Sequence, residues 1–112
     1  MTTYKPRDIV LVNFIFSEGS GFKKRPALIL SSDEYHRSRQ EVIIAAITSN
    51  VQRILTGDTK IKEWKTANLL FPSLAAGILQ TIKTEMIERK LGIIALEDFD
   101  QVQKNLKIIF GL

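Results

Sequence analysis

The sequence predicts a mainly β domain with some helix, in which short strands form a small barrel and the chain ends in an amphipathic helix. The apolar segments are short, rich in β-branched and aromatic residues, and separated by irregular polar connections. That pattern is typical of a barrel rather than of alternating βαβ units. The last segment instead repeats its apolar residues at helical spacing. A chain of 112 residues fits one core, so we expect a single domain over residues 1–112.

The first strand is expected over residues 8–16, a run of β-branched and aromatic residues. Odd and even positions are both largely apolar, so this strand should be buried on much of both faces. Residues 17–21, Ser-Glu-Gly-Ser-Gly, predict a loop. A second strand is expected over residues 26–30, with Pro26 at its start, where a missing N–H group is tolerated.

The middle of the chain alternates between polar turns and short apolar runs. Residues 32–39 predict a helical turn capped by Ser32, and residues 42–47 are apolar enough to form a central strand. The turn signal Gly57-Asp58 lies between short β-like pieces within residues 55–62. A further helical turn is expected within residues 63–70, before Pro72.

The last third predicts two strands and the terminal helix. Strands are expected over residues 75–82 and 91–94, the second one after the charged residues 88–90. Acidic residues Glu97 and Asp98 then suit the first turn of a helix, where the helix dipole favours negative charge. The apolar face of this helix is expected to consist of Phe99, Val102, Leu106, Ile109 and Phe110.

Composition excludes several classes of protein. The absence of cysteine excludes disulfides and thiolate chemistry, and a single histidine excludes a multi-histidine metal site within one chain. No apolar run approaches the roughly 20 residues of a membrane span, and the N-terminus has no signal-like apolar segment. We therefore expect a soluble cytoplasmic protein without metal, cofactor or membrane contact. The net charge of +4 suits a polyanion such as RNA, although many proteins of this charge bind no nucleic acid.

Several segments resemble the MazF/PemK family of toxin ribonucleases in order and spacing. They are Asp8-Ile-Val-Leu-Val, Phe14-Ile-Phe-Ser, a glycine-containing loop, Lys24-Arg-Pro-Ala-Leu-Ile-Leu, Ile44-Ala-Ala-Ile-Thr-Ser and, later, Arg89-Lys-Leu-Gly. The resemblance implies an SH3-like barrel with a terminal helix, usually a homodimer, that cuts single-stranded RNA such as mRNA at short sequences. It also implies a cognate antitoxin that lays a peptide over the RNA groove.

The chain departs from the family pattern at three places. The family often has glycine where this chain has Arg7, many members have proline where it has Ile15, and a small capping residue often stands in place of Ala95. These departures concern the geometry of loops and caps. They leave the RNA sequence that is cut undetermined.

The resemblance assigns catalysis to an arginine in the Arg-Pro motif and a hydroxyl residue that ends the third strand, which here are Arg25 and Thr48. RNA carries its own nucleophile in the 2′-hydroxyl, so cleavage needs alignment, help in losing a proton and stabilisation of phosphorane charge. A guanidinium stays protonated and binds two phosphate oxygens, which suits the last task. Ser49 is a second hydroxyl candidate. The alternative interpretations are a surface cation for Arg25 and a turn-forming hydroxyl for Thr48.

Further residues are candidates for RNA binding because basic and aromatic side chains together suit a single-stranded nucleic acid. These candidates are Lys23, Lys24, Phe16, Phe22, Lys60, Lys62 and Trp64, with Gln80 added by its position relative to the family. The lysines are alternatively solvated charges, and the aromatic residues are alternatively core. His36 is a less favoured acid–base candidate, because it lies in a polar segment outside the motif.

The sequence favours a metal-independent, sequence-specific endoribonuclease of a toxin–antitoxin pair, which leaves a 2′,3′-cyclic phosphate and a 5′-hydroxyl end. Two alternatives remain open. One is a gyrase poison that resembles CcdB and has no catalytic activity. The other is an inactive RNA-binding relative, because activity depends on Arg25 and Thr48 meeting in space.

Overall fold

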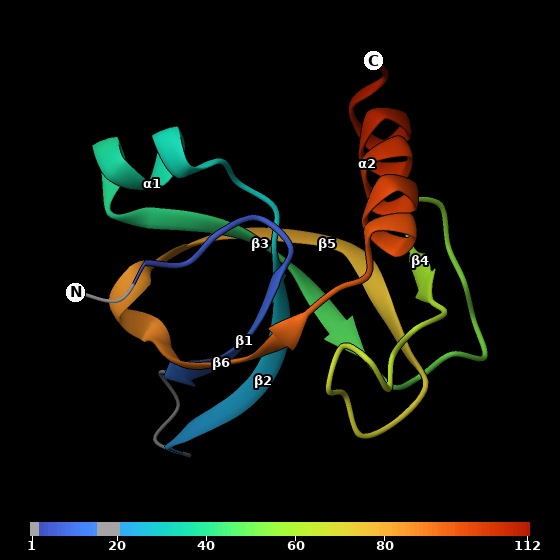
Figure 1. Cartoon of the computed structure of the whole chain (residues 1–112), viewed down its shortest axis with the longest axis horizontal. Helices are drawn as coiled ribbons and strands as arrows, with labels where there is room; N and C mark the ends of the chain where they lie inside the picture. Colours follow the sequence, from blue (N-terminus) through green and yellow to red (C-terminus); the bar gives the residue numbers. More distant parts are fainter. Residues whose placement is uncertain (1–2, 16–20) are drawn as a thin grey trace.

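The protein forms one curled sheet with two helices packed on it (Figure 1). The computed structural model describes residues 3–15 and 21–112, except for the side chains of Ile15 and Phe22. The elements are β1 (Asp8–Ile15), β2 (Phe22–Ile29), α1 (Asp33–Arg39), β3 (Glu41–Thr48), β4 (Thr59–Ile61), β5 (Ser73–Lys83), the 3₁₀ turn η1 (Thr84–Met86), β6 (Ile87–Ile93) and α2 (Leu96–Phe110). The prediction of a mainly β fold with a terminal helix is confirmed.

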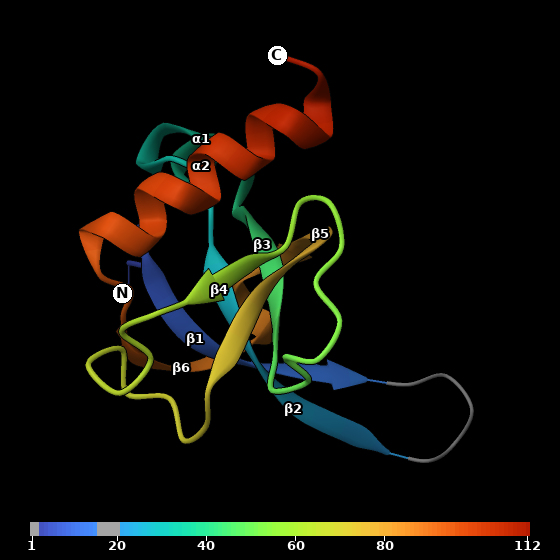
Figure 2. The same cartoon turned by 90° about the vertical axis from the view of Figure 1, so that its right-hand side faces the viewer.

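The sheet is antiparallel, with strand order β4-β5-β3-β2-β1-β6. The third strand lies between β2 and β5, so the expected central strand is confirmed. Strong curvature bends the sheet into a barrel-like shape, and α2 lies against β4 and β5 (Figure 2).

The two edge strands of the sheet, β4 and β6, are connected by a turn rather than by strand pairing. Asn68 Nδ2, in the turn that follows β4, donates a hydrogen bond of 2.8 Å to the carbonyl oxygen of Leu91 in β6. A Cβ atom at Gly92 would lie only 2.3 Å from the carbonyl oxygen of Ala67, so this close approach requires glycine. The turn thus fills the gap between β4 and β6.

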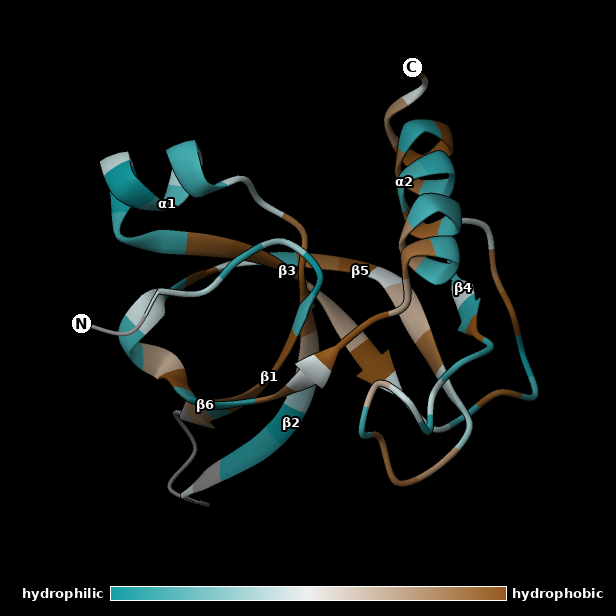
Figure 3. Cartoon of the chain, in the orientation of Figure 1, coloured by the Kyte–Doolittle hydropathy of each residue, from teal (hydrophilic) through white to brown (hydrophobic). Residues whose placement is uncertain are grey.

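Two apolar clusters stabilise the two faces of the sheet. The first lies beneath α2 and includes Ile9, Leu28 and Phe99, and the second includes Val10 and Ile29. Strand β1 contributes to both clusters, which confirms that it is buried on much of both faces. Hydropathy follows this division, since β1 and β3 are largely apolar while α2 alternates between polar and apolar residues (Figure 3).

Two strands begin earlier than the sequence predicted. Strand β2 begins at Phe22, because it pairs with β1 from Phe22 to Leu28, whereas pairing with β3 begins only at Ala27. Pro26 therefore lies within the strand but has a strand neighbour on one side only, where its missing N–H is tolerated. Strand β6 begins at Ile87 and includes the charged residues 88–90, which an edge strand exposes to solvent.

The remaining differences concern short segments. Only residues 59–61 form a strand within 55–62. Residues 63–70 form a turn in which the Ala67 N–H donates to the Glu63 carbonyl, as in one helical turn. The expected cap on α1 is confirmed, because the Tyr35 N–H donates to Ser32 Oγ at 3.2 Å. Phe110 does not join the buried face of α2, because the last turn of the helix leaves it 62% exposed.

The backbone at Arg7 has a conformation that glycine adopts without strain. Its φ angle of 80° lies in the left-handed region, which costs a side-chain-bearing residue about 1–2 kcal/mol. The guanidinium offsets this cost, because Nη2 donates to the carbonyl oxygen of Ile94 at 2.9 Å. The Arg7 N–H also donates to the Ile29 carbonyl, and the Ile94 N–H donates to the Arg7 carbonyl. Arg7 therefore joins β1, β2 and the start of α2.

These contacts predict different stabilities for alanine and for glycine at position 7. Arg7→Ala keeps the backbone strain and loses the guanidinium bonds, so it should lower the free energy of unfolding by roughly 1–2 kcal/mol. Arg7→Gly loses the same bonds but relieves the strain, so it should be about 1 kcal/mol more stable than Arg7→Ala. Urea denaturation measures both values. Equal stability of the two variants would show that the left-handed conformation costs nothing here.

Candidate functional site

Strands β2, β3 and β5 form a pocket of about 240 Å³ on one face of the sheet. Arg25 from β2, Thr48 from β3 and Gln80 from β5 supply most of its polar groups. The other lining residues are Phe14, Pro26, Ala27, Ile44, Ala46, Ile47 and Ile78. The volume is smaller than the roughly 300 Å³ at which pockets for whole small molecules begin. It suits one group of a longer ligand.

The register of β2 and β3 places Arg25 and Thr48 in this pocket. Ala27 pairs with Ala46, and Arg25 precedes one of these residues by two positions while Thr48 follows the other by two. Side chains two positions apart leave the same face of a strand, so antiparallel pairing directs both toward one face. Pairing of the two strands does not extend past Ala27. The strands therefore separate where the two side chains stand, which leaves room between them.

The hydroxyl group of Thr48 both forms a turn and lines the pocket. Its Oγ1 accepts a hydrogen bond of 3.1 Å from the Asn50 N–H, as the turn interpretation expected. A hydroxyl has one hydrogen to donate and two lone pairs, so its hydrogen is available to an oxygen in the pocket. Arg25 is exposed at the other side of the same pocket. A cationic donor and a hydroxyl donor thus face one small space.

Gln80 adds a group that both donates and accepts hydrogen bonds. It pairs with Ile44 across β3 and β5, and its side chain is exposed. Beside it, Ile78 is 66% exposed. Sequence reasoning did not find Ile78, since it lies in an apolar run that predicts an ordinary buried strand. It lies beside an irregularity in the sheet that local sequence does not report.

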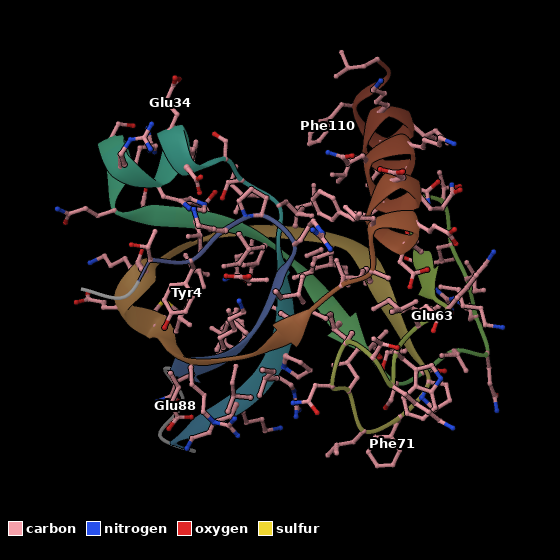
Figure 4. The ribbon with its side chains drawn as sticks, viewed as in Figure 1. Tyr4, Glu34, Glu63, Phe71, Glu88 and Phe110 are labelled. Carbon is pink, nitrogen blue, oxygen red and sulfur yellow. The ribbon has the colours of Figure 1, made fainter. Side chains whose placement is uncertain are left out.

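Not every RNA-binding candidate on the hairpin of β1 and β2 lines the pocket. Lys24 leaves the opposite face of β2 from Arg25 and forms an ion pair with Glu88 of β6, with 2.9 Å between Nζ and Oε1 (Figure 4). Lys23 is exposed and shares the face of Arg25 by strand alternation. Phe16 lies outside the described residues, and so does the side chain of Phe22.

Ser49 is exposed beyond the end of β3 and does not line the pocket.

The basic segment that follows β4 is held in place by a buried carboxylate. Asp98, in the first turn of α2, accepts hydrogen bonds from the N–H groups of Lys62 and Glu63, at 3.1 and 2.9 Å. Trp64 is partly buried against the first core cluster, and the Lys65 ammonium lies 5.4 Å from the centroid of its ring. The structure thus supports core packing for Trp64.

Lys60 shares a face of the sheet with Thr48. It pairs with Leu74 of β5, which in turn pairs with Thr48 of β3. Residues in register leave the same face, so Lys60 stands two strands from Thr48, at a backbone distance of about 10 Å. Lys60 and Lys62 are both exposed, but neither lines the pocket.

His36 forms a structural hydrogen-bond chain away from the pocket. The Ile43 N–H donates to Ser31 Oγ, so the Ser31 hydroxyl is free to donate to His36 Nε2 at 2.6 Å. His36 Nδ1 then donates to the Tyr4 carbonyl at 2.9 Å. The imidazole thus ties the N-terminal segment to β3.

Two further features bear on the class of protein. Among the residues that the structure describes, no group of three or more histidine, cysteine, aspartate or glutamate side chains could hold a metal ion. Within the same residues, no helix has the length and apolar character needed to cross a membrane.

The family of the chain follows from its similarity to known proteins. Residues 5–110 match the model of the PemK-like, MazF-like toxins of type II toxin–antitoxin systems. The chain belongs to this family. The match covers the whole barrel and all of α2, so the PemK/MazF-like fold accounts for every element described above. Among curated proteins, no sequence matches the chain.

Solved structures share the fold of this PemK/MazF-like chain from end to end. A MazE–MazF structure from Deinococcus radiodurans has a TM-score of 0.84 at 16% identity, with 100% of this chain and 99% of that chain covered. The Mycobacterium tuberculosis toxin MazF-mt6 has a TM-score of 0.74 at 25% identity, covering 95% and 98%. An endoribonuclease in complex with its cognate antitoxin, from a mycobacterial species, has a TM-score of 0.77 at 16% identity, covering 98% and 97%.

Proposed function

We propose that this PemK/MazF-like toxin is an endoribonuclease that cuts single-stranded RNA, such as mRNA, in the cytoplasm. The observation that carries the proposal is the meeting of Arg25 and Thr48 at one pocket. Similar structures named as endoribonucleases support the same activity. The family also implies a protein antitoxin as partner, and similar toxins occur in complex with theirs.

The proposed reaction is an internal transfer at one phosphate. The 2′-oxygen of the ribose 5′ to the cut gives its proton to water and bonds to phosphorus. The bond from phosphorus to the 5′-oxygen breaks, and that oxygen takes a proton from water. The products are a 2′,3′-cyclic phosphate and a 5′-hydroxyl end. Arg25 donates hydrogen bonds to the phosphate oxygens, where negative charge grows in the transition state. Thr48 donates its hydroxyl hydrogen to a nearby oxygen and so aligns the attacking group.

The same pocket suits one unstacked base of a single strand. Its walls are mostly apolar, as a base face requires, and Gln80 offers a donor and an acceptor to a base edge. Lys60 and Lys23 lie on the same face of the sheet as the pocket, where they attract the phosphates that flank the cut. Duplex RNA hides its base edges in a narrow groove, so a single strand is the proposed substrate.

This arrangement also separates the nuclease from the two alternatives. A gyrase poison acts by binding a protein and has no use for a guanidinium and a hydroxyl group that face one small space. An inactive relative is disfavoured, because both donors that the proposed reaction needs line the pocket. The arrangement therefore favours a nuclease.

We propose that two copies of the chain form a homodimer through the end of α2. Gly57 contacts Ile109, because a Cβ atom at Gly57 would lie 2.7 Å from Ile109 Cδ1. Gly57 also packs against Gly77 in β5. Exposed apolar side chains cluster in sequence around these contacts, namely Ile54, Leu55, Ile108, Phe110 and Leu112. A second copy of the same face would cover this apolar surface.

Two neighbouring cations test the assignment of the site. Arg25→Ala should leave the melting temperature unchanged and lower kcat/KM for RNA cleavage about a hundredfold, which corresponds to about 3 kcal/mol of lost transition-state stabilisation. Lys24→Ala removes a charge on the opposite face, so it should lower kcat/KM by no more than about threefold, through weaker attraction of RNA. Similar losses in the two folded variants would remove Arg25 from the site.

The identity of the attacking group is tested by one atom of the substrate. Replacing the single ribose 5′ to the cut by deoxyribose should abolish cleavage and change binding little, because the phosphate contacts remain. Cleavage of the all-RNA oligonucleotide should persist in excess EDTA, since no metal-activated water is needed. Product ends and binding are measured in parallel. If the deoxy oligonucleotide were cut at the same rate, water would be the nucleophile and the proposed reaction would be wrong.

The proposed dimer is tested with two phenylalanines of equal exposure. Phe110 and Phe71 are 62% and 61% exposed and lie at opposite ends of the molecule (Figure 4). Sedimentation velocity should show a dimer that Phe110→Lys converts to a monomer, because the new charge would be buried in the interface. Phe71→Lys should leave the dimer intact. A wild-type monomer at all concentrations, or the reverse effect of the two variants, contradicts the proposed interface.

A further inference from the structure

Strand β5 carries an irregularity beside the pocket. Ala45 of β3 pairs with Leu79, and Ile47 pairs with Ala75. One residue of β3 therefore faces three residues of β5, namely Ala76, Gly77 and Ile78. Such a bulge bends a strand and redirects its side chains, often next to an active site. The bulge lies between Leu74 and Gln80 along β5, and Leu74 pairs with Thr48.

The bulge is held by a side chain from outside the sheet. Asp58 Oδ1 accepts a hydrogen bond of 2.7 Å from the Gly77 N–H, which supplies an acceptor for an amide in the interrupted part of the ladder. Asp58 Oδ2 accepts a second bond, of 2.8 Å, from the Leu55 N–H. One carboxylate thus joins the turn before β4 to the centre of the bulge.

Two glycines allow this close approach. A Cβ atom at Gly77 would lie 3.2 Å from the carbonyl carbon of Gly57, so the two backbones pack without side chains between them. Gly57 has a φ angle of 95°, a conformation that favours glycine. Asp58 follows directly, and its carbonyl oxygen accepts a bond of 3.2 Å from Asn105 Nδ2 of α2. The turn is therefore fixed to the helix on one side and to β5 on the other.

We propose that Asp58 is a positioning residue for base selection. By holding the Gly77 bulge, its carboxylate fixes Ile78 and Gln80 at the pocket, and the positions of these two side chains set which base the pocket accepts. The inference rests on the proposed function, because it concerns how the same pocket chooses RNA. Arg25 and Thr48 stand on β2 and β3, so Asp58 affects selection of the base and leaves the chemistry at the phosphate unchanged.

Asp58→Asn is the sharpest variant, with Asn105→Ala as its matched control. An asparagine places an NH₂ group against one of the two N–H donors, and its neutral oxygen is a weaker acceptor than a carboxylate oxygen. The bond to the Gly77 N–H is therefore lost or weakened in either orientation of the amide. Asn105→Ala removes the bonds from Asn105 Nδ2 to the Asp58 carbonyl and to Thr59 Oγ1. It therefore loosens the same turn without touching Gly77. Both are compared with the wild-type protein at a temperature where all three are folded.

The first readout is cleavage of a set of RNAs in which each base of the wild-type cut sequence is replaced singly. Asp58→Asn should raise KM and reduce discrimination about tenfold at one base position, while kcat on the preferred RNA stays within about threefold. Asn105→Ala should keep the wild-type discrimination. Unchanged discrimination in Asp58→Asn, equal loss in the control, or loss of kcat with KM unchanged each overturns the inference.

The second readout needs no RNA and separates this inference from the proposed function. Hydrogen exchange of the Gly77 amide should become about tenfold faster in Asp58→Asn, but not in Asn105→Ala, because only the first variant disturbs its acceptor. Unchanged exchange at Gly77 overturns the inference whether or not RNA is cut. Faster exchange in a protein whose wild-type form cuts no RNA leaves Asp58 as the anchor of the bulge and rejects the nuclease, and with it the role in base selection.

Discussion

The pairing of β2 with β3 is the constraint on which the site depends. Ladder pairs connect these strands only at residues 27–29 of β2 and 44–46 of β3. Beyond Ala27 the strands separate, and Arg25 and Thr48 stand on the two sides of the gap on a shared face. A slip of one residue would turn one of the two side chains to the other face of the sheet. The buried residues of both apolar clusters prevent such a slip, because each strand would then expose its core positions.

The groups that stabilise the barrel are separate from those that line the pocket. Arg7 joins the start of β1 to the start of α2, Asn68 joins the two edge strands, and Asp98 holds the segment after β4. None of these three residues lines the pocket. Arg25 and Gln80 are exposed side chains on strands whose backbones are already fixed, which matches a rigid scaffold that presents groups to a ligand. Substitutions at the site should therefore change activity more than stability.

Local pattern was sufficient to predict the strand character of β1 and β3 and the amphipathic nature of α2, because burial repeats with the period of each element. The family resemblance added Arg25 and Thr48. Strand pairing determined the side-chain positions that no local sequence pattern indicates. Lys24 is adjacent to Arg25 in sequence, yet strand alternation turns it toward Glu88. Ile78 belongs to an apolar run, yet it is exposed beside the bulge at Gly77. Both outcomes depend on residues far away in the chain, so no window of sequence contains them.

A double-mutant cycle of Arg25 and Thr48 tests the central claim most directly, since that claim is that the two side chains act together on one phosphate. Single-turnover cleavage of one RNA is measured for the wild type, Arg25→Ala, Thr48→Ala and the double variant. Groups that stabilise the same transition state act as a unit, so their effects on the rate are strongly non-additive. We expect the loss of rate in the double variant, relative to the wild type, to be close to that of the slower single variant. It should be far smaller than the product of the two single losses. Losses that multiply would mean that the two residues act independently, and the account of a shared site would be wrong.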